Sequence, residues 1–258
     1  MMDQQPAHWI EALSGSHERL RSLVEPLDAD RLQGPSYASE WSIAQVLSHL
    51  GSGAEIFTLF LDAGLTGAAV PGHEQFEPIW AAWNSKSAAA NAADALACDA
   101  AFVERISSLD PAERDSLHIA MFGMDIDVIG LARMRLGEHA VHTWDIAVAL
   151  DSAATVAPDA VALLVDTLDQ LVARLAKPAG GAQRLLIRTT GPDRVFLLDV
   201  GDSVSLTATD GEAGLTELRI PAEGLLRLVY GRLDPAHTPA GVEGGADLDA
   251  LRGVFPGF

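Results

Sequence analysis

Apolar residues recur along the first 150 positions with the three- to four-residue spacing that is typical of amphipathic helices. One of the predicted helices begins at Ser42, with Gln45 three positions later, which is the pattern of a capping box. Glycine and proline are frequent in the segments between the helices. The long helices are predicted over residues 7–27, 42–64, 80–109 and 125–150. We therefore expect residues 1–151 to form a four-helix bundle.

The pattern changes after Asp151, where one more apolar helix is followed by short alternating or β-branched runs. Turn signals such as Gly191-Pro192 and Asp210-Gly211 separate these runs, so we expect an antiparallel meander. The strands are predicted over residues 184–190, 195–200, 204–209 and 216–220, between helices over 160–175, 221–230 and 248–254. Residues 152–258 then form a second, smaller α+β domain, and the fold class of the whole chain is α+β.

Composition excludes several classes of function. The net charge is −19, and no cluster of lysine and arginine is present, so we expect no nucleic-acid partner. No apolar run is long enough for a membrane span, and the N-terminus lacks the basic and apolar regions of a signal peptide. We therefore expect a cytoplasmic protein that is not bound to a membrane. Composition leaves the oligomeric state open.

Cys98 is the single cysteine of the chain, which excludes an internal disulfide and a thiolate metal cluster. It lies in an alanine-rich helical run with acidic neighbours, among them Asp94 and Asp99, which raise a thiol pKa. We expect a buried structural cysteine rather than a nucleophile.

Three polar residues fall on helix faces that are predicted to point into the bundle. Glu138 and His142 are four residues apart and project within about 60° of one another on a helix. His49 lies on the core-facing side of the second predicted helix, so two imidazoles and a carboxylate can meet. Three protein ligands leave one coordination position open, as in a catalytic zinc site. An alternative is a metal-free bundle in which the three side chains are satisfied by hydrogen bonds.

Neighbouring residues leave further choices open. His139 also forms an i,i+3 pair with His142, but it points about 100° away from Glu138 on a helix, so we prefer Glu138 as the ligand. Asp145 is either a carboxylate that orients a ligand imidazole or an exposed acid. His17 has no partner near it in sequence, and we expect it at the surface.

The segments WSIAQVLSHL and RMRLGEHAVHTWDIAVAL, together with LLRLVYGRLDP and LDALRGVFPG near the end, resemble the mycothiol-dependent maleylpyruvate isomerase family. The resemblance covers nearly the whole chain. It implies an N-terminal DinB-like metal-binding bundle and a C-terminal domain similar to sterol-carrier modules. It also implies that His49, Glu138 and His142 bind a divalent metal, with zinc preferred over nickel and iron. An arginine used for activity would be Arg232, with Arg227 as the second choice.

The family resemblance implies an enzyme that uses mycothiol as a thiol cosubstrate. In one version it isomerises a small cis-enoyl diacid, with Arg232 holding a substrate carboxylate. In another version it is an S-transferase that attaches the thiol to an electrophile. A third reading is a non-catalytic, metal-stabilised protein that binds an apolar ligand. The identity of the substrate does not follow from the sequence.

Overall fold

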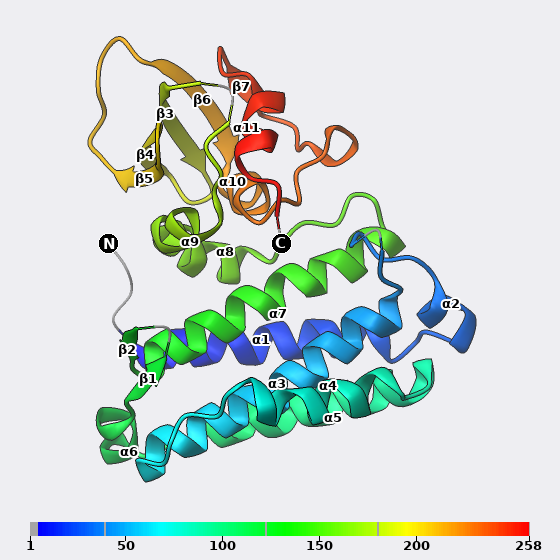
Figure 1. Ribbon diagram of the computed structural model, residues 1–258. Helices are drawn as coiled ribbons and strands as arrows, with labels where there is room; N and C mark the ends of the chain where they lie inside the picture. Colours follow the sequence, from blue (N-terminus) through cyan, green and yellow to red (C-terminus); the bar gives the residue numbers. More distant parts are fainter. Residues whose placement is uncertain (1–4, 39, 122, 180, 258) are drawn as a thin grey trace. The chain divides into compact units, whose positions relative to one another are not determined.

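The structure of the chain is a computed structural model that describes residues 5–38, 40–121, 123–179 and 181–257. Internal contacts divide it into two compact units, one that ends at Thr155 and one that begins at Val156. The first unit is mainly helical and the second combines a sheet with helices, so the expected α+β class is confirmed (Figure 1).

Helices dominate the first unit. α1 packs along α7, and α3 packs along α5, so these four long helices form the bundle (Figure 1). A two-stranded antiparallel hairpin precedes α7. The elements are α1 (Pro6–Val24), α2 (Ala29–Gln33), α3 (Ile43–Thr66), α4 (His73–Asn84), α5 (Ala88–Ser107), α6 (Pro111–Ser116), β1 (Ile119–Met121), β2 (Met124–Ile126) and α7 (Val128–Leu150).

The start of α3 is fixed by the capping box that the sequence predicts. The Ser42 hydroxyl accepts a hydrogen bond from the backbone N–H of Gln45 at 3.2 Å, and the Gln45 side chain accepts one from the Ser42 N–H at 2.9 Å. These two bonds satisfy N–H groups that a helix start leaves without partners. At its other end α3 stops at Thr66, because Gly67 takes the left-handed conformation with φ 66°.

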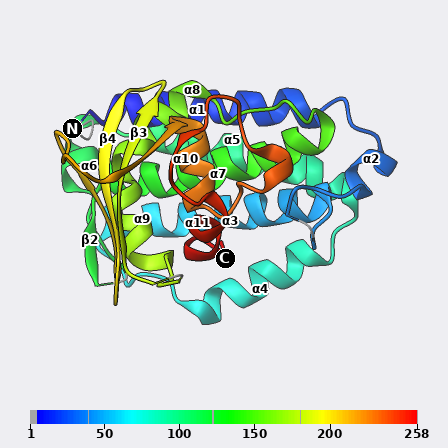
Figure 2. The ribbon, with the colours of Figure 1, turned by 90° about the horizontal axis from the view of Figure 1, so that it is seen from above.

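The connection expected over residues 64–79 was wrong, because it contains the start of α4. The expected single helix over residues 80–109 is also two helices, α4 and α5, separated where the Ser87 side chain caps α5 by accepting from the Ala90 N–H. α4 runs along the outer edge of the helical unit (Figure 2), and Trp83 is its buried residue. The Trp83 ring lies against Gly51 of α3, where a Cβ would come within 2.1 Å of it.

α7 begins three residues later than the sequence pattern predicts. The side chain of Asp127 caps it by accepting from the Gly130 N–H at 2.7 Å, while Asp125 belongs to the hairpin β1–β2. Among the described residues, no helix combines the length and the apolar character that crossing a bilayer requires.

The second unit is built around a five-stranded sheet with the order β5-β4-β3-β6-β7. The predicted helix over residues 160–175 is broken into α8 and α9 by a turn of 3-10 helix, Val165–Thr167. The other elements include a second 3-10 turn, Pro235–His237. The helices and strands are α8 (Pro158–Leu164), α9 (Leu168–Leu175), β3 (Gln183–Thr190), β4 (Arg194–Val200), β5 (Val204–Ala208), β6 (Thr216–Pro221), α10 (Ala222–Val229), β7 (Glu243–Gly244) and α11 (Leu248–Val254).

The sheet is not the simple antiparallel meander that was expected. β3–β4, β4–β5 and β6–β7 pair antiparallel, but β6 pairs with β3 and runs parallel to it. After β5 the chain passes through residues 209–215, too long a connection for a two-residue hairpin, and enters the sheet on the far side of β3. Inward side chains such as Ile187 and Ile220 are fully buried, whereas Arg188 and Glu217 form an ion pair on the other face.

A network of buried polar side chains crosses the interior of the bundle. Asp99 of α5 lies at its centre, with Oδ2 2.8 Å from Nδ1 of His17 on α1 and 2.9 Å from Nε2 of His139 on α7. Its Oδ1 accepts from Arg135 of α7 at 2.7 Å. The expectation that His17 lies at the surface was wrong, because the Asp99 carboxylate gives the imidazole a buried partner.

Candidate metal centre

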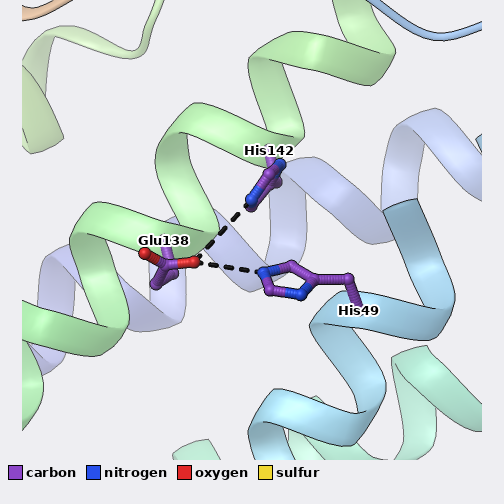
Figure 3. Close-up of side chains that lie close together, drawn as sticks. All are labelled: His49, Glu138 and His142. Carbon is purple, nitrogen blue, oxygen red and sulfur yellow. Dashed lines mark hydrogen bonds and ion pairs between the residues drawn. The ribbon is translucent and has the colours of Figure 1, made fainter. Parts of the chain in front are cut away.

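His49 of α3 and Glu138 and His142 of α7 come together between the two helices (Figure 3). One donor atom from each lies within 4.8 Å of the others. Nε2 of His49 is 3.1 Å from Oε2 of Glu138, and Nε2 of His142 is 3.7 Å from the same oxygen. The α7 pair meets because residues four apart share a helix face, and α3 brings the third donor across from a position 89 residues earlier.

These separations fit a small divalent cation. Two nitrogen or oxygen donors bonded to zinc at tetrahedral angles lie about 3.3 Å apart, given bond lengths of about 2.0–2.1 Å. The two distances to Oε2 of Glu138, 3.1 Å and 3.7 Å, lie on either side of that value. Two imidazoles and a carboxylate are also a donor set that zinc accepts. The residues present therefore fit the metal that the sequence suggests.

The site is partly open to solvent. The side chains of His49 and Glu138 are 38% and 34% exposed, whereas that of His142 is 10% exposed. His49 therefore lies at the edge of the bundle, whereas the sequence pattern predicts that it faces the core. A cation held by three donors in this position keeps one side available to a further ligand.

Glu138 is held as a carboxylate. Burial acts to raise its pKa, but the hydrogen bond from His49 and the charges of His142 and His49 outweigh burial and lower the pKa to about 2. A ligand carboxylate has to be deprotonated to bind metal, so Glu138 is ready to bind at neutral pH.

Asp145 lies behind His142. Its Oδ2 is 2.9 Å from Nδ1 of His142, and the Asp145 side chain is completely buried. A carboxylate at Nδ1 fixes the proton on that nitrogen and leaves Nε2, the atom nearer Glu138, with its lone pair free. Of the two roles that the sequence allows for Asp145, the geometry favours orientation of the imidazole over exposure to solvent.

Trp41 is a site residue whose position the sequence does not reveal. Its ring lies 6.2 Å from that of His142 at 24°, and 5.4 Å from that of His49. The sequence signal, an apolar residue just before the Ser42 cap, suggests only a hydrophobic contact at the start of a helix. The indole is nevertheless 37% exposed, so it provides an apolar surface beside the three donors.

His139 points away from the three donors. Its Nε2 faces Asp99, and its Nδ1 is 2.8 Å from the hydroxyl of Ser16. Burial lowers the pKa of His139 even though Asp99 acts to raise it. The geometry favours Glu138 over His139 as the neighbour of His142 in the site.

The two candidate arginines of the second unit differ in their surroundings. Arg227 of α10 is 3% exposed, forms a two-point ion pair with Glu223, and donates to the carbonyls of Arg232 and His237. Arg232 is half-buried, and its Nη1 donates to the carbonyl of Tyr230 at 2.8 Å. Arg227 therefore has a structural task, which favours Arg232 as the arginine that meets a ligand.

Cys98 is half-buried, and its Sγ is 3.9 Å from Glu55. Burial and the charge of Glu55 raise the pKa of the thiol. Since the reactive form of cysteine is the thiolate, this environment makes Cys98 a poor nucleophile.

Two family models match the chain. Residues 13–147 match the Mycothiol maleylpyruvate isomerase N-terminal domain, and residues 147–253 match the MDMPI C-terminal domain. No curated protein sequence matches.

Solved structures with the same fold include the mycothiol-dependent maleylpyruvate isomerase and a histidine-to-alanine mutant of a protein with that name. Both match with a TM-score of 0.68 over 94% of this chain and 93% of the other, at 14% and 13% identity. At such low identity the TM-score shows a shared fold alone, whereas the two family models cover nearly the whole chain. The chain therefore belongs to the mycothiol-dependent maleylpyruvate isomerase family.

Proposed function

We propose that the chain is a metal-dependent enzyme that uses mycothiol as cosubstrate to convert a small cis-enoyl diacid into its trans isomer. The observation that carries the proposal is the convergence of His49, Glu138 and His142 within 4.8 Å at a half-exposed position. Three donors with one open side are the arrangement of a catalytic metal site rather than a structural one. Membership of the family supports mycothiol as the thiol.

His49, Glu138 and His142 would hold the cation, with zinc as the preferred ion. When bound, it would lower the pKa of a coordinated thiol, so that the thiol reacts as a thiolate at neutral pH. Asp145 would keep Nε2 of His142 turned toward the site through the hydrogen bond at Nδ1. Trp41 would cover part of the rim and offer an apolar wall to the cosubstrate or substrate.

The reaction needs no oxidant or reductant. The thiolate forms a C–S bond to one alkene carbon, and the electron pair of the double bond moves into the conjugated carbonyl. Rotation about the resulting C–C single bond follows. The pair then returns to re-form the double bond in the trans geometry, and the C–S bond breaks to release the thiolate. Arg232 would hold a substrate carboxylate through its planar pair of N–H donors.

A turnover assay tests the proposal. The full chain loaded with zinc is incubated with a cis-enoyl diacid such as maleylpyruvate, with and without mycothiol, and the trans product is measured by chromatography. We expect product only when mycothiol is present, with no net consumption of the thiol. The matched control is His49→Ala, which should form no product above the background rate.

The same assay separates the other functions that the sequence allows. Consumption of one mycothiol for each electrophile, with a stable thioether product, would identify an S-transferase. Metal uptake without any thiol-dependent turnover would instead favour a non-catalytic protein that binds an apolar ligand.

A further inference from the structure

Arg135 joins the two helices that carry the candidate metal ligands. It lies on α7, three residues before Glu138, and its Nη2 donates to the backbone carbonyl of Leu50 at 2.9 Å. Leu50 follows His49 directly on α3. A charged hydrogen bond therefore spans from α7 to α3 within one helical turn of both ligands.

The guanidinium is held in place from a third helix. The same Nη2 donates to Oδ1 of Asp99 on α5 at 2.7 Å, and both side chains are 1% exposed. Asp99 is in turn fixed by His17 of α1 at 2.8 Å. All four long helices of the bundle thus meet in one polar network.

Gly53 makes room for this arrangement. A Cβ built at Gly53 would lie 2.9 Å from Nη1 of Arg135, and among the described residues it would meet no other side chain within 4 Å. The position of the glycine on α3, one turn beyond His49, lets the guanidinium reach the Leu50 carbonyl. The absence of a side chain at position 53 therefore makes space for Arg135 in particular.

We propose that Arg135, anchored by Asp99, is a positioning residue that sets the separation of His49 and Glu138. The inference rests on the proposed function in that it takes these residues to bind metal. Among the described residues, Arg135 hydrogen-bonds to none of the three donors, and its charge reaches Glu138 only through space. Its hydrogen bond to the Leu50 carbonyl therefore acts on the spacing of α3 and α7. A metal with bonds of about 2 Å tolerates little change in the distance between its ligands, which makes affinity a sensitive measure of that spacing.

The test separates positioning from general stability. The variants are Arg135→Met, the pair Arg135→Met with Asp99→Asn, and Gly53→Ala, with Ile106→Ala as the control. Ile106 is fully buried on α5, two turns from Asp99, so its truncation weakens the same bundle without touching the network. The full chain of each variant is titrated with zinc against a chromophoric chelator, the Co²⁺ form is examined by visible absorption, and unfolding of the metal-free form is followed in urea.

We expect Arg135→Met to lower both stability and zinc affinity, the latter by about tenfold or more, the range found for residues that orient metal ligands. The double variant removes both buried charges and should regain much of the stability, because no unpaired charge is left. Its zinc affinity should stay reduced and its Co²⁺ spectrum should stay altered. Gly53→Ala should lose less stability than Arg135→Met, because the higher helix propensity of alanine offsets part of the cost of displacing the guanidinium. It should lose zinc affinity in the same direction.

Two results in the variants of the network would overturn the inference while leaving the proposed metal site intact. One is zinc affinity in the double variant that recovers together with stability. The other is wild-type affinity and an unchanged Co²⁺ spectrum in a folded Gly53→Ala protein. If the wild-type chain takes up no zinc or cobalt, the proposed function fails and the inference fails with it. If Ile106→Ala loses as much zinc affinity as Arg135→Met, Arg135 affects the metal site only by stabilising the bundle, and the inference is wrong.

Discussion

Oδ2 of Asp145 lies 2.9 Å from Nδ1 of His142, the ring nitrogen that does not face Glu138. We expect Asp145→Asn to fold and to bind zinc about 10- to 100-fold more weakly, because an amide fixes the tautomer less firmly and makes the imidazole less basic. Competition with a chromophoric chelator measures the change. Glu11→Gln, on an exposed acid of α1, is the control and should bind like the wild type. An unchanged affinity in Asp145→Asn would remove the aspartate from the site.

His49→Ala and His142→Ala should each abolish stoichiometric zinc binding, since each removes one of three donors. The purified wild-type chain should carry close to one zinc ion, as measured by mass spectrometry of the metal content. His139→Ala is the matched control. It removes a histidine from α7, the helix that carries His142, but this histidine belongs to the buried network around Asp99 and not to the three donors. It should lose stability and keep its zinc stoichiometry. Full zinc content in a folded His49→Ala protein would exclude α3 from the site.

Substitution of the two arginines of the second unit, Arg227 and Arg232, should have different effects. Arg232→Ala should leave the fold and the zinc content unchanged and lower kcat/KM for the diacid, because its proposed task is to hold substrate. Arg227→Ala leaves the Glu223 carboxylate, which is only 13% exposed, without its partner and should cost about 3 kcal/mol of stability. Urea denaturation and steady-state kinetics on both variants separate the two effects. Normal kinetics in Arg232→Ala would contradict the proposed role.

Stability should fall in acid partly through Asp99. Burial acts to raise the pKa of this carboxyl, but His139 and Arg135 outweigh it, and the pKa lies well below the ordinary 3.8. A carboxylate with a lowered folded-state pKa stabilises the protein fully above its unfolded pKa and loses that contribution as pH falls through the folded pKa. Asp99 is faced by His17 from α1 and by Arg135 and His139 from α7.

We therefore expect the wild type to be more stable than Asp99→Asn at pH 7, with a difference that shrinks as the pH falls below about 4. Urea unfolding at several pH values with a chelator present measures this difference without a contribution from metal. A difference that persists unchanged to pH 3 would show that Asp99 does not carry the charge assigned to it.

Cys98→Ser should keep full activity, and both it and the wild type should need added mycothiol. The thiol of Cys98 is half-buried and has a raised pKa, so it supplies little thiolate. Turnover assays with and without mycothiol make the comparison. Turnover in the absence of any added thiol, or loss of activity in a folded Cys98→Ser protein, would reject an external nucleophile.

Local signals in the sequence predict local structure well. Ser42 and Gln45 lie three residues apart, and the side chain of each accepts a hydrogen bond from the backbone N–H of the other. Their pattern therefore predicts the start of α3 from the local sequence alone. Glu138 and His142 share a helix face for the same reason. The bundle that the periodicity predicts then gives His49 a position from which it can meet them.

Contacts between distant segments are harder to predict. His17 and Asp99 are 82 residues apart, and nothing near either residue indicates that a buried partner exists. The parallel pairing of β6 with β3 depends on which edge of the sheet the chain reaches after β5, and strand patterns do not specify that choice. α4 is missed because a segment rich in glycine and proline precedes it and Pro78 lies inside it.

The fit of Trp83 against Gly51 has a consequence for motion. α4 buries this one residue, while the helices of the bundle bury whole faces. The free energy that holds α4 in place is therefore a small part of the free energy that holds the bundle together, and α4 can open while the bundle stays folded. Amide hydrogens of α4 then exchange with solvent through this local opening, on a faster timescale than those of α3 and α7, and a protease that reaches the opened segment cuts there before the bundle unfolds.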